Sequence, residues 1–281
     1  MGIGGRRSAE QGSIGGMGVS RRGLVRGGLA ALGGAAATLG VLRGREWFGP
    51  DRLPIDGGYA PAGNELGWHE RGTVDVLWHV HTEQPLVALT FDDGPEPDWT
   101  PRVLDTLDRL DAPATFFVVG ERLRRNAALV RDRYARHEVG NHTWAHKDLA
   151  QRDDKGVRDQ LRRCHDAIAD VVGREPTLMR PPWGHLGGTT LTVAEELGYD
   201  VVMWSQRMRE DVFRADPGGI AADTAAAARP GAIILAHDVG DRDRLVTIDH
   251  LAEIITGLRD RGLRLVTVSA LRAAAAQHAA T

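Results

Sequence analysis

From residue 74 to the end of the chain, short β-rich runs alternate with helical patterns, and this alternation restricts the fold more than any other feature. The β-rich runs cover residues 74–80, 86–91, 114–119, 138–141, 177–180, 200–204, 232–236 and 264–268. The helical patterns between them cover residues 101–110, 122–136, 157–172, 189–197, 219–228 and 244–261. Strands that alternate with helices are typical of a parallel sheet with helical crossovers. We therefore predict an α/β fold whose parallel sheet is either open or closed into a barrel.

The first 48 residues differ in composition from the rest. A paired arginine, Arg21 and Arg22, precedes a weakly apolar run of Gly, Ala and Leu that ends near residue 42. This pattern resembles a twin-arginine export signal, and its many glycines make it a poor spanning helix. We predict that residues 1–48 form an export signal or N-terminal anchor. The protein would then be extracellular or in the cell envelope, where this segment could tether it to the membrane; a disordered tail is the alternative.

Residues 49–73 are rich in Gly, Pro and Asp and are predicted to be a linker, which leaves residues 74–281 as the folded domain. The net charge is −3, but the first 50 residues hold seven arginines and two glutamates, so the remaining 231 carry 28 basic and 36 acidic side chains. Nucleic-acid binding needs a basic face, so we expect no nucleic-acid partner. Cys164 is the only cysteine, which excludes an intramolecular disulfide, and its helical context predicts a buried side chain.

Polar side chains gather at the C-terminal ends of the predicted strands. Asp92 and Asp93 follow the run 86–91 in the segment LTFDDGP, and two adjacent carboxylates repel each other unless water or a cation separates them. The other polar residues that end or follow such runs are His142, His146, Arg180 and His237. In a parallel α/β barrel these ends meet at one mouth, where the chemistry lies. A surface turn is the alternative for the two aspartates, but scattered turns would not follow this pattern.

His142 and His146 are four residues apart in NHTWAH, so on a helix or its entry turn both rings can face one way. With one aspartate they would form a two-histidine, one-carboxylate metal site with open positions for water. The second aspartate could then act as a base, because the metal offsets the repulsion between the two carboxylates. Exposed histidines are the alternative for this pair, and iron also suits the ligand set.

Further residues fit a site at the same mouth. Arg180, followed by the rigid Pro181 and Pro182, could hold a carboxylate through two hydrogen bonds, and His237 could act as a general acid. An exposed arginine and a structural histidine are the alternatives. Four tryptophans near the motifs suit either a sugar-binding cleft or the core, with Trp204 assigned to the core as a mid-strand residue. They are Trp99, Trp144, Trp183 and Trp204.

Four motifs in this order, TFDDGP, HTWAH, RPPWG and LAHD, resemble the signature of the polysaccharide deacetylases, carbohydrate esterase family four. The resemblance covers roughly residues 85–268 and implies a distorted (β/α) barrel with about seven parallel strands, as a single catalytic domain. It also implies removal of acetyl groups from N-acetylglucosamine polymers or xylan with one divalent metal ion, usually zinc. The metal ligands would be Asp93, His142 and His146, the catalytic residues Asp92, Arg180 and His237, and the substrate-binding residues Trp183 and Leu235.

The resemblance also assigns roles. Asp92 would be the catalytic base, Arg180 would orient it, and His237 would protonate the leaving group. The backbone N–H of Trp183 would help to hold the oxyanion, and Leu235 would line the acetate pocket. Trp99 and Trp144 are added as substrate-binding candidates because flat rings beside the motifs suit a sugar.

One motif departs from the family. Trp204 is followed by Ser-Gln-Arg-Met, without the aspartate that the family uses to position the catalytic histidine. Glu210, Asp211 and Asp238 are the candidate substitutes. Without a paired carboxylate, the pKa of His237 would be set differently.

These features predict an exported metal-dependent hydrolase that removes acetyl groups from a cell-wall or extracellular glycan, with peptidoglycan or chitooligosaccharide favoured. Its partner is then the acetylated glycan, and no obligate protein partner is evident. An acetylxylan esterase with the same site is the nearest alternative. A non-haem iron oxygenase would not need the extra base and acid. A glycan-binding barrel that has lost activity is supported only by the altered motif.

Overall fold

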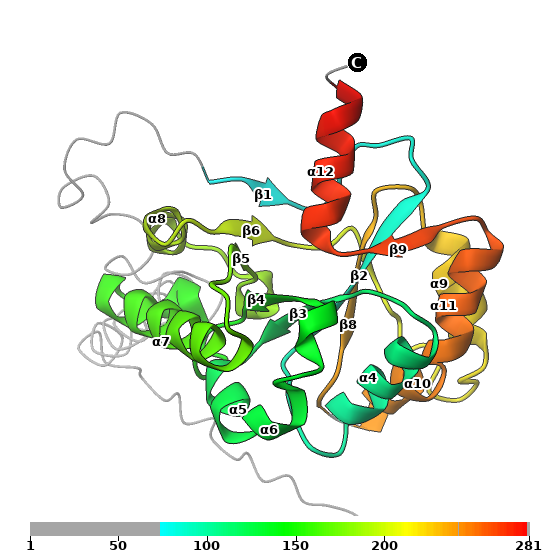
Figure 1. Cartoon of the computed structure of the whole chain (residues 1–281), viewed down its shortest axis with the longest axis horizontal. Helices are drawn as coiled ribbons and strands as arrows, with labels where there is room; N and C mark the ends of the chain where they lie inside the picture. The colour runs from blue at the N-terminus through cyan, green and yellow to red at the C-terminus, as the bar shows by residue number, and fades with distance from the viewer. Residues whose placement is uncertain (1–73, 241, 280–281) are drawn as a thin grey trace, which may run out of the picture. The chain divides into compact units, whose positions relative to one another are not determined.

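A computed structural model describes residues 74–240 and 242–279 (Figure 1). The predicted export signal at 1–48 and the predicted linker at 49–73 lie outside the described residues. Within the described part, no helix combines the length and the apolar character needed to cross a membrane. Elements are numbered as in Figure 1, so the described helices begin with α4.

One parallel sheet organises the described part of the chain. Its strands are β1 (Val76–Leu77), β2 (Leu86–Asp92), β3 (Thr115–Val118), β4 (Glu138–Asn141), β5 (Leu178–Met179), β6 (Asp200–Val202), β7 (Gln206–Arg207), β8 (Ile233–His237) and β9 (Arg264–Val266). The order is β1-β6-β5-β4-β3-β2-β8-β7, and β9 pairs in parallel with the start of β2. The sheet curls into a half-barrel with helices around it, which confirms the predicted distorted α/β barrel.

Helices connect most successive strands, the exceptions being β1 to β2 and β6 to β7, and they cover the sheet (Figure 1). The α-helices are α4 (Thr100–Arg109), α5 (Gly120–Arg125), α6 (Ala127–Val130), α7 (Asp154–Val172), α8 (Gly188–Glu196), α9 (Gly219–Ala227), α10 (Leu245–Asp249), α11 (Leu251–Asp260) and α12 (Val268–Ala279). Short 3₁₀ helices are η1 (Tyr134–Arg136), η2 (Leu149–Gln151), η3 (Pro182–Gly184) and η4 (Arg242–Arg244). Helix α7 packs against α5 and α8, and α11 packs against α9 and α4. Cys164, on the inner face of α7, is buried as predicted.

Strand β2 is the centre of the fold, and every residue of its sequence LVALTFD is buried. Side chains alternate between the two faces of a strand. Leu89 and Phe91 accordingly belong to the main hydrophobic core, where Phe91 stacks on Phe116 with ring centroids 5.3 Å apart, while Leu86 and Ala88 belong to a second core. Burial on both faces explains the continuous apolar run and fixes the end of β2, where Asp92 lies.

Two predicted helices are broken. The predicted helix at 122–136 is divided into α5, α6 and η1. Helix α5 ends at Arg125, and the side-chain amide of the next residue, Asn126, donates to the carbonyl oxygen of Pro95 (3.0 Å). The predicted helix at 244–261 is divided into α10 and α11 at His250, whose φ of −107° departs from helical geometry. The 3.6-residue pattern therefore located these helical segments without locating their breaks.

The predicted strand at 74–80 is reduced to the two residues of β1. The reason is that Val80 leaves this pairing and donates its N–H to the carbonyl oxygen of Gly231, just before β8 (3.0 Å). The predicted strand at 200–204 likewise ends at Val202, so Trp204 follows β6 and does not lie within a strand. Strand β7 was not predicted from the sequence.

Candidate active site

The turn after β2 places two carboxylates at the carboxyl edge of the sheet. Asp92 is the last residue of β2 and Asp93 begins the turn, and both are buried. Asp93 has a φ of 83°, in the left-handed region that aspartate tolerates better than most residues. The Gly94 N–H donates to Asp238 Oδ1 (3.0 Å), and a β-carbon at Gly94 would lie 2.2 Å from that carboxylate, so only glycine fits here.

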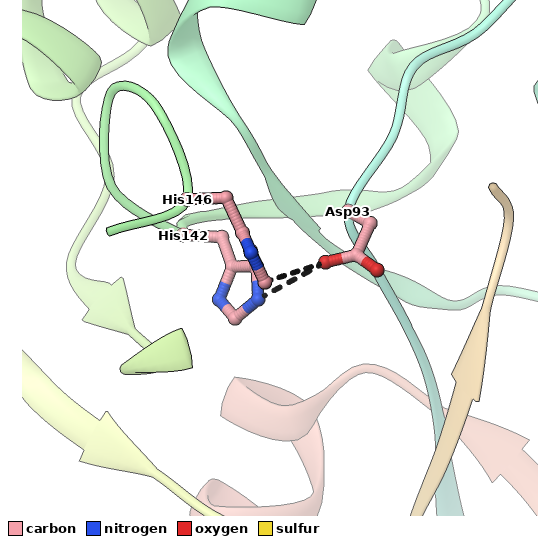
Figure 2. A group of neighbouring side chains, drawn as sticks. All are labelled: Asp93, His142 and His146. Atoms are coloured by element: carbon pink, nitrogen blue, oxygen red, sulfur yellow. Dashed lines mark ion pairs between the residues drawn. The ribbon is translucent and has the colours of Figure 1, made fainter. Parts of the chain in front are cut away.

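Asp93, His142 and His146 converge on one point (Figure 2). Asp93 Oδ1 lies 3.4 Å from His142 Nε2 and 3.0 Å from His146 Nε2. Donor atoms about 2.1 Å from a tetrahedral ion lie roughly 3.4 Å from one another. The three side chains therefore fit a divalent cation such as zinc, as the sequence predicts.

The two histidines lie on an irregular loop after β4, and the expectation of a helix or helix entry at this point is wrong. Thr143 and His146 have φ values of 69° and 50°, which turn the loop sharply. The loop is anchored by Asn141, whose Oδ1 accepts from the Thr143 N–H (2.8 Å) and whose amide donates to the Tyr199 hydroxyl (2.9 Å). This backbone conformation, rather than helical spacing, turns both rings toward Asp93.

A backbone carbonyl fixes the protonation of His142. Its Nδ1 lies 2.7 Å from the carbonyl oxygen of Arg180. Because a carbonyl can only accept, Nδ1 carries a proton, so the neutral ring would present the lone pair of Nε2 to an ion bound between the three side chains, the arrangement that metal-ligating histidines adopt. Burial opposes the charged form of His142, but Asp92 and Asp93 outweigh it and raise its pKa; burial likewise opposes ionisation of Asp93, and both histidines lower its pKa.

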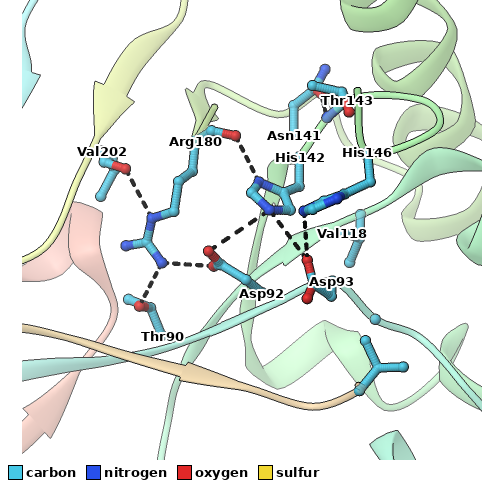
Figure 3. A network of polar contacts seen from close by, with 12 residues as sticks. Thr90, Asp92, Asp93, Val118, Asn141, His142, Thr143, His146, Arg180 and Val202 are labelled. Atoms are coloured by element: carbon cyan, nitrogen blue, oxygen red, sulfur yellow. Dashed lines mark hydrogen bonds and ion pairs between the residues drawn. The ribbon is translucent and has the colours of Figure 1, made fainter. Parts of the chain in front are cut away.

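Arg180 lies just after β5 and is completely buried (Figure 3). Its NH1 group donates to Asp92 Oδ1 (2.7 Å) and to Thr90 Oγ1 (2.8 Å). The predicted bidentate contact with a carboxylate is absent, because Nε donates to the carbonyl oxygen of Val202 and NH2 to that of Met203, each at 2.9 Å. The side chain of Arg180 therefore contacts Asp92 from a fixed position against the ends of β2 and β6.

His237 is the last residue of β8, and in the register of β2 and β8 it pairs with Asp92. Its Nδ1 is buried, with no hydrogen-bond partner in the described part of the chain. Burial lowers the pKa of His237 to about 4, against the opposing charge of Asp92. The ring is therefore neutral near pH 7 in the absence of substrate.

None of the three candidate carboxylates takes the place of the missing aspartate among the described residues. Glu210 accepts from the Thr247 hydroxyl (2.9 Å), and Asp211 pairs with Arg207 at the surface. Asp238 accepts from Gly94 and from the Thr100 hydroxyl (2.6 Å), and burial raises its pKa to about 7. Asp238 therefore supports the turn that carries Asp93 and makes no hydrogen bond with Nδ1 of His237.

Two arginines that the sequence analysis did not identify hold Asp93. Arg122 NH1 donates to its backbone carbonyl (2.9 Å), and Arg244 NH1 donates to its Oδ2 (2.5 Å). Arg244 is 151 positions away in the sequence and belongs to none of the motifs, so no sequence signal could have found it.

Of the predicted substrate-binding residues, Trp183 lies beside the metal site. Its side chain is exposed, and its ring centroid is 4.5 Å from that of His146. Leu235 is buried in β8, two residues before His237. Trp99 and Trp144 pack against the main core, and Arg163 lies over the Trp144 ring, which favours the core alternative for both.

The site combines a buried aspartate held by an arginine with two imidazoles and a second carboxylate. These groups are suited to water activation and proton transfer. At the carboxyl edge of a parallel half-barrel, this set indicates a hydrolase with an α/β fold whose site suits a metal ion. Comparison with known protein families shows that residues 79–202 match the family described as "Polysaccharide deacetylase". The chain belongs to the polysaccharide deacetylase family, a family of hydrolases known as carbohydrate esterase family four.

Individual relatives agree with this assignment. A peptidoglycan-N-acetylglucosamine deacetylase of Bacillus cereus is 38% identical over 199 residues, which span 70% of this chain and 92% of the relative. Peptidoglycan-N-acetylglucosamine deacetylase PgdA of Listeria monocytogenes is also 38% identical, over 66% of this chain but only 38% of its own length. A chitooligosaccharide deacetylase of Sinorhizobium fredii is 37% identical over 64% of this chain and 89% of its own length.

A solved structure shares the fold. The crystal structure of the Bc1960 peptidoglycan N-acetylglucosamine deacetylase superimposes with a TM-score of 0.65 at 30% identity. The match covers 70% of this chain and 92% of that protein. The similarity therefore includes nearly all of that enzyme and most of the described part of this chain.

Proposed function

We propose that this chain hydrolyses N-acetyl groups of an amino-sugar polymer, with peptidoglycan as the first candidate and chitooligosaccharide as the second, in a reaction that depends on a divalent metal. The observation that carries the proposal is the convergence of Asp93, His142 and His146 beside the buried pair of Asp92 and Arg180. Three ligands leave open positions for water and substrate, as hydrolytic metal sites require.

Asp93 Oδ1 and the Nε2 atoms of His142 and His146 would hold the ion, and zinc is the metal that best suits this donor set. A divalent ion bound there would supply Lewis-acid assistance to the acetyl carbonyl and to the attacking water. Arg180 holds Asp92 at the end of β2, where the free oxygen of its carboxylate can accept a proton from water. The exposed ring of Trp183 offers a flat surface to a sugar.

The leaving amine requires a proton, and His237 is the side chain in register with Asp92 that can donate one. With a pKa lowered to about 4, only about one molecule in a thousand carries that proton at pH 7. In the absence of substrate, His237 is therefore rarely in the acid form that this step needs. The lack of a carboxylate on the buried Nδ1 of His237 in the described part of the chain favours a second candidate function, a glycan-binding barrel with weak or no turnover.

The choice of an amino-sugar polymer is supported by the peptidoglycan and chitooligosaccharide deacetylases among the relatives. Acetylxylan remains the alternative substrate, because the same groups can cleave an ester. We also propose export to the cell envelope through residues 1–48, on the strength of the paired arginines alone. Fractionation of cells that produce the full chain, compared with an Arg21→Lys/Arg22→Lys variant, tests the location.

The function is tested by acetate release from peptidoglycan, N-acetylated chitooligosaccharides and acetylxylan. The full chain is assayed after removal of metal by a chelator and again after addition of Zn²⁺. Zinc-dependent release from an amino-sugar substrate supports the proposal, and release from xylan alone would move the activity to the esterase. Binding of a glycan without acetate release by the zinc-loaded protein would favour the second candidate.

A further inference from the structure

The two oxygens of Asp93 point to different partners. Oδ1 faces the two imidazoles, and Oδ2 is directed away from them (Figure 2). Arg244 NH1 lies 2.5 Å from Oδ2 and also donates to the carbonyl oxygen of Val239 at 2.6 Å. The carboxylate of Asp93 is 10% exposed and the Arg244 side chain 27%, so this ion pair is largely protected from water. The guanidinium is itself fixed by the backbone, and it therefore fixes Oδ2.

Each of the adjacent carboxylates thus has an arginine of its own. Arg180 pairs with Asp92 from the sheet, and Arg244 pairs with Asp93 from the segment that follows β8. Two neighbouring carboxylates at a buried site repel each other, and a cation on each offsets that repulsion. Arg244 can therefore hold the carboxylate of Asp93 in one orientation before any metal binds.

We propose that Arg244 is a positioning residue of the metal site, which holds Oδ2 so that Asp93 presents Oδ1 alone to the ion. The inference rests on the proposed metal site and goes beyond it, because Arg244 would not contact the metal. A partner that orients a metal-ligating carboxylate restricts it to the productive geometry, and loss of such a partner weakens metal binding. Without the guanidinium, Asp93 is free to rotate or to offer both oxygens.

The test measures the Zn²⁺ affinity of the full chain by competition with a chromophoric chelator. Arg244→Met keeps much of the side-chain volume and removes the charge and the donors. We expect it to weaken Zn²⁺ binding about 10–100-fold, the usual effect of losing an outer partner of a metal ligand. Arg244→Lys, which keeps a cation and a donor but not the fork, should lose less.

The matched control is Arg102→Met, which removes the exposed ion pair of Arg102 with Asp249 on α10 and leaves Asp93 untouched. It should bind Zn²⁺ as the wild type does. A second readout is the visible spectrum of bound Co²⁺, which reports the coordination of the ion. The spectrum should change in Arg244→Met, because Oδ2 becomes available, and should stay the same in the control.

The outcomes separate this inference from the proposed function. If the wild-type protein binds no Zn²⁺, the metal site is wrong and the role of Arg244 with it. If the wild type binds Zn²⁺ and Arg244→Met binds it equally or more tightly with an unchanged Co²⁺ spectrum, Arg244 is only a neighbouring charge and this inference is overturned. Circular dichroism of the metal-free proteins verifies folding, and Arg244→Lys carries the test if the Met variant does not fold.

Discussion

Arg180 and Asp92 form an ion pair that is almost completely excluded from solvent. The NH1–Oδ1 distance is 2.7 Å, and the two side chains are 0% and 5% exposed. Three of the contacts of Arg180 go to Thr90 and to backbone carbonyls, so the arginine is held whether or not Asp92 is charged. The ion pair therefore both stabilises the ends of the strands and positions Asp92, the proposed base.

Replacement of Arg180 by Met should destabilise the protein by about 3–5 kcal/mol, because it leaves a buried carboxylate without its partner. Urea denaturation followed by circular dichroism measures the change. The control is Arg209→Met, which breaks an exposed pair with Asp223 and should cost less than about 1 kcal/mol. Equal losses in the two variants would mean that the buried pair has no special role.

Replacement of Asp92 by Asn should lower the rate of acetate release by about 10²–10⁴-fold, the range found for loss of a general base. Zn²⁺ affinity should stay within a few-fold of the wild type, since Asp92 is not among the three converging ligands. The two measurements are made on the same preparation. A parallel loss of zinc and activity would instead place Asp92 in the metal site.

Replacement of His146 by Ala should abolish tight Zn²⁺ binding and, with it, acetate release, because it removes one of three ligands. His185→Ala is the matched control: this histidine is nearby but exposed, and it contacts Asp148 rather than Asp93. Equilibrium dialysis against Zn²⁺ gives the stoichiometry of both variants. One bound Zn²⁺ per chain in His146→Ala, at wild-type affinity, would contradict the proposed ligand set.

Stability should fall in weak acid because of His137, which directly precedes β4 and is buried against Phe116. Burial lowers its pKa to about 4, so the unfolded chain binds more protons between pH 6.5 and 4. The stabilisation is complete above about pH 6.5, declines as the pH falls and is lost near pH 4, with a total on the order of 3 kcal/mol.

The contribution of His137 is isolated by His137→Asn, since an asparagine oxygen can accept from the Ala114 N–H as His137 Nδ1 does. The difference in unfolding free energy between wild type and variant should narrow from pH 7 to pH 4.5. A constant difference across this range would show that His137 does not titrate on unfolding.

The alternation of strands and helices predicted the sheet because a strand that is buried on both faces has a continuous apolar sequence, as in the run LVALTFD of β2. The site was predictable because its motifs follow strand ends, and parallel strands bring those ends together. Asp92, Asp93, His142 and Arg180 therefore came together as expected from the chain alone.

What the sequence did not predict depends on tertiary contacts. The hydrogen bond of Asn126 at the end of α5 reaches Pro95, 31 positions away, and the contact of Arg244 with Asp93 joins segments 151 positions apart. The loop with His142 and His146 has left-handed backbone at Thr143 and His146. The conformational preferences of these residue types do not predict such a backbone. The sequence showed that the aspartate expected to pair with His237 is missing, but it did not show that the His237 ring is buried.

The register of β2 and β8 sets Asp92 and His237 on neighbouring parallel strands, so their backbones are separated by one strand spacing, about 4.8 Å. That distance is a property of peptide hydrogen bonding and cannot be adjusted by exchanging side chains. Changes in the surrounding loops can alter which polymer enters. The spacing between the backbones of the proposed base and the proposed acid stays constant, so every substrate must place its reacting bond between two side chains whose anchor points are set by the sheet.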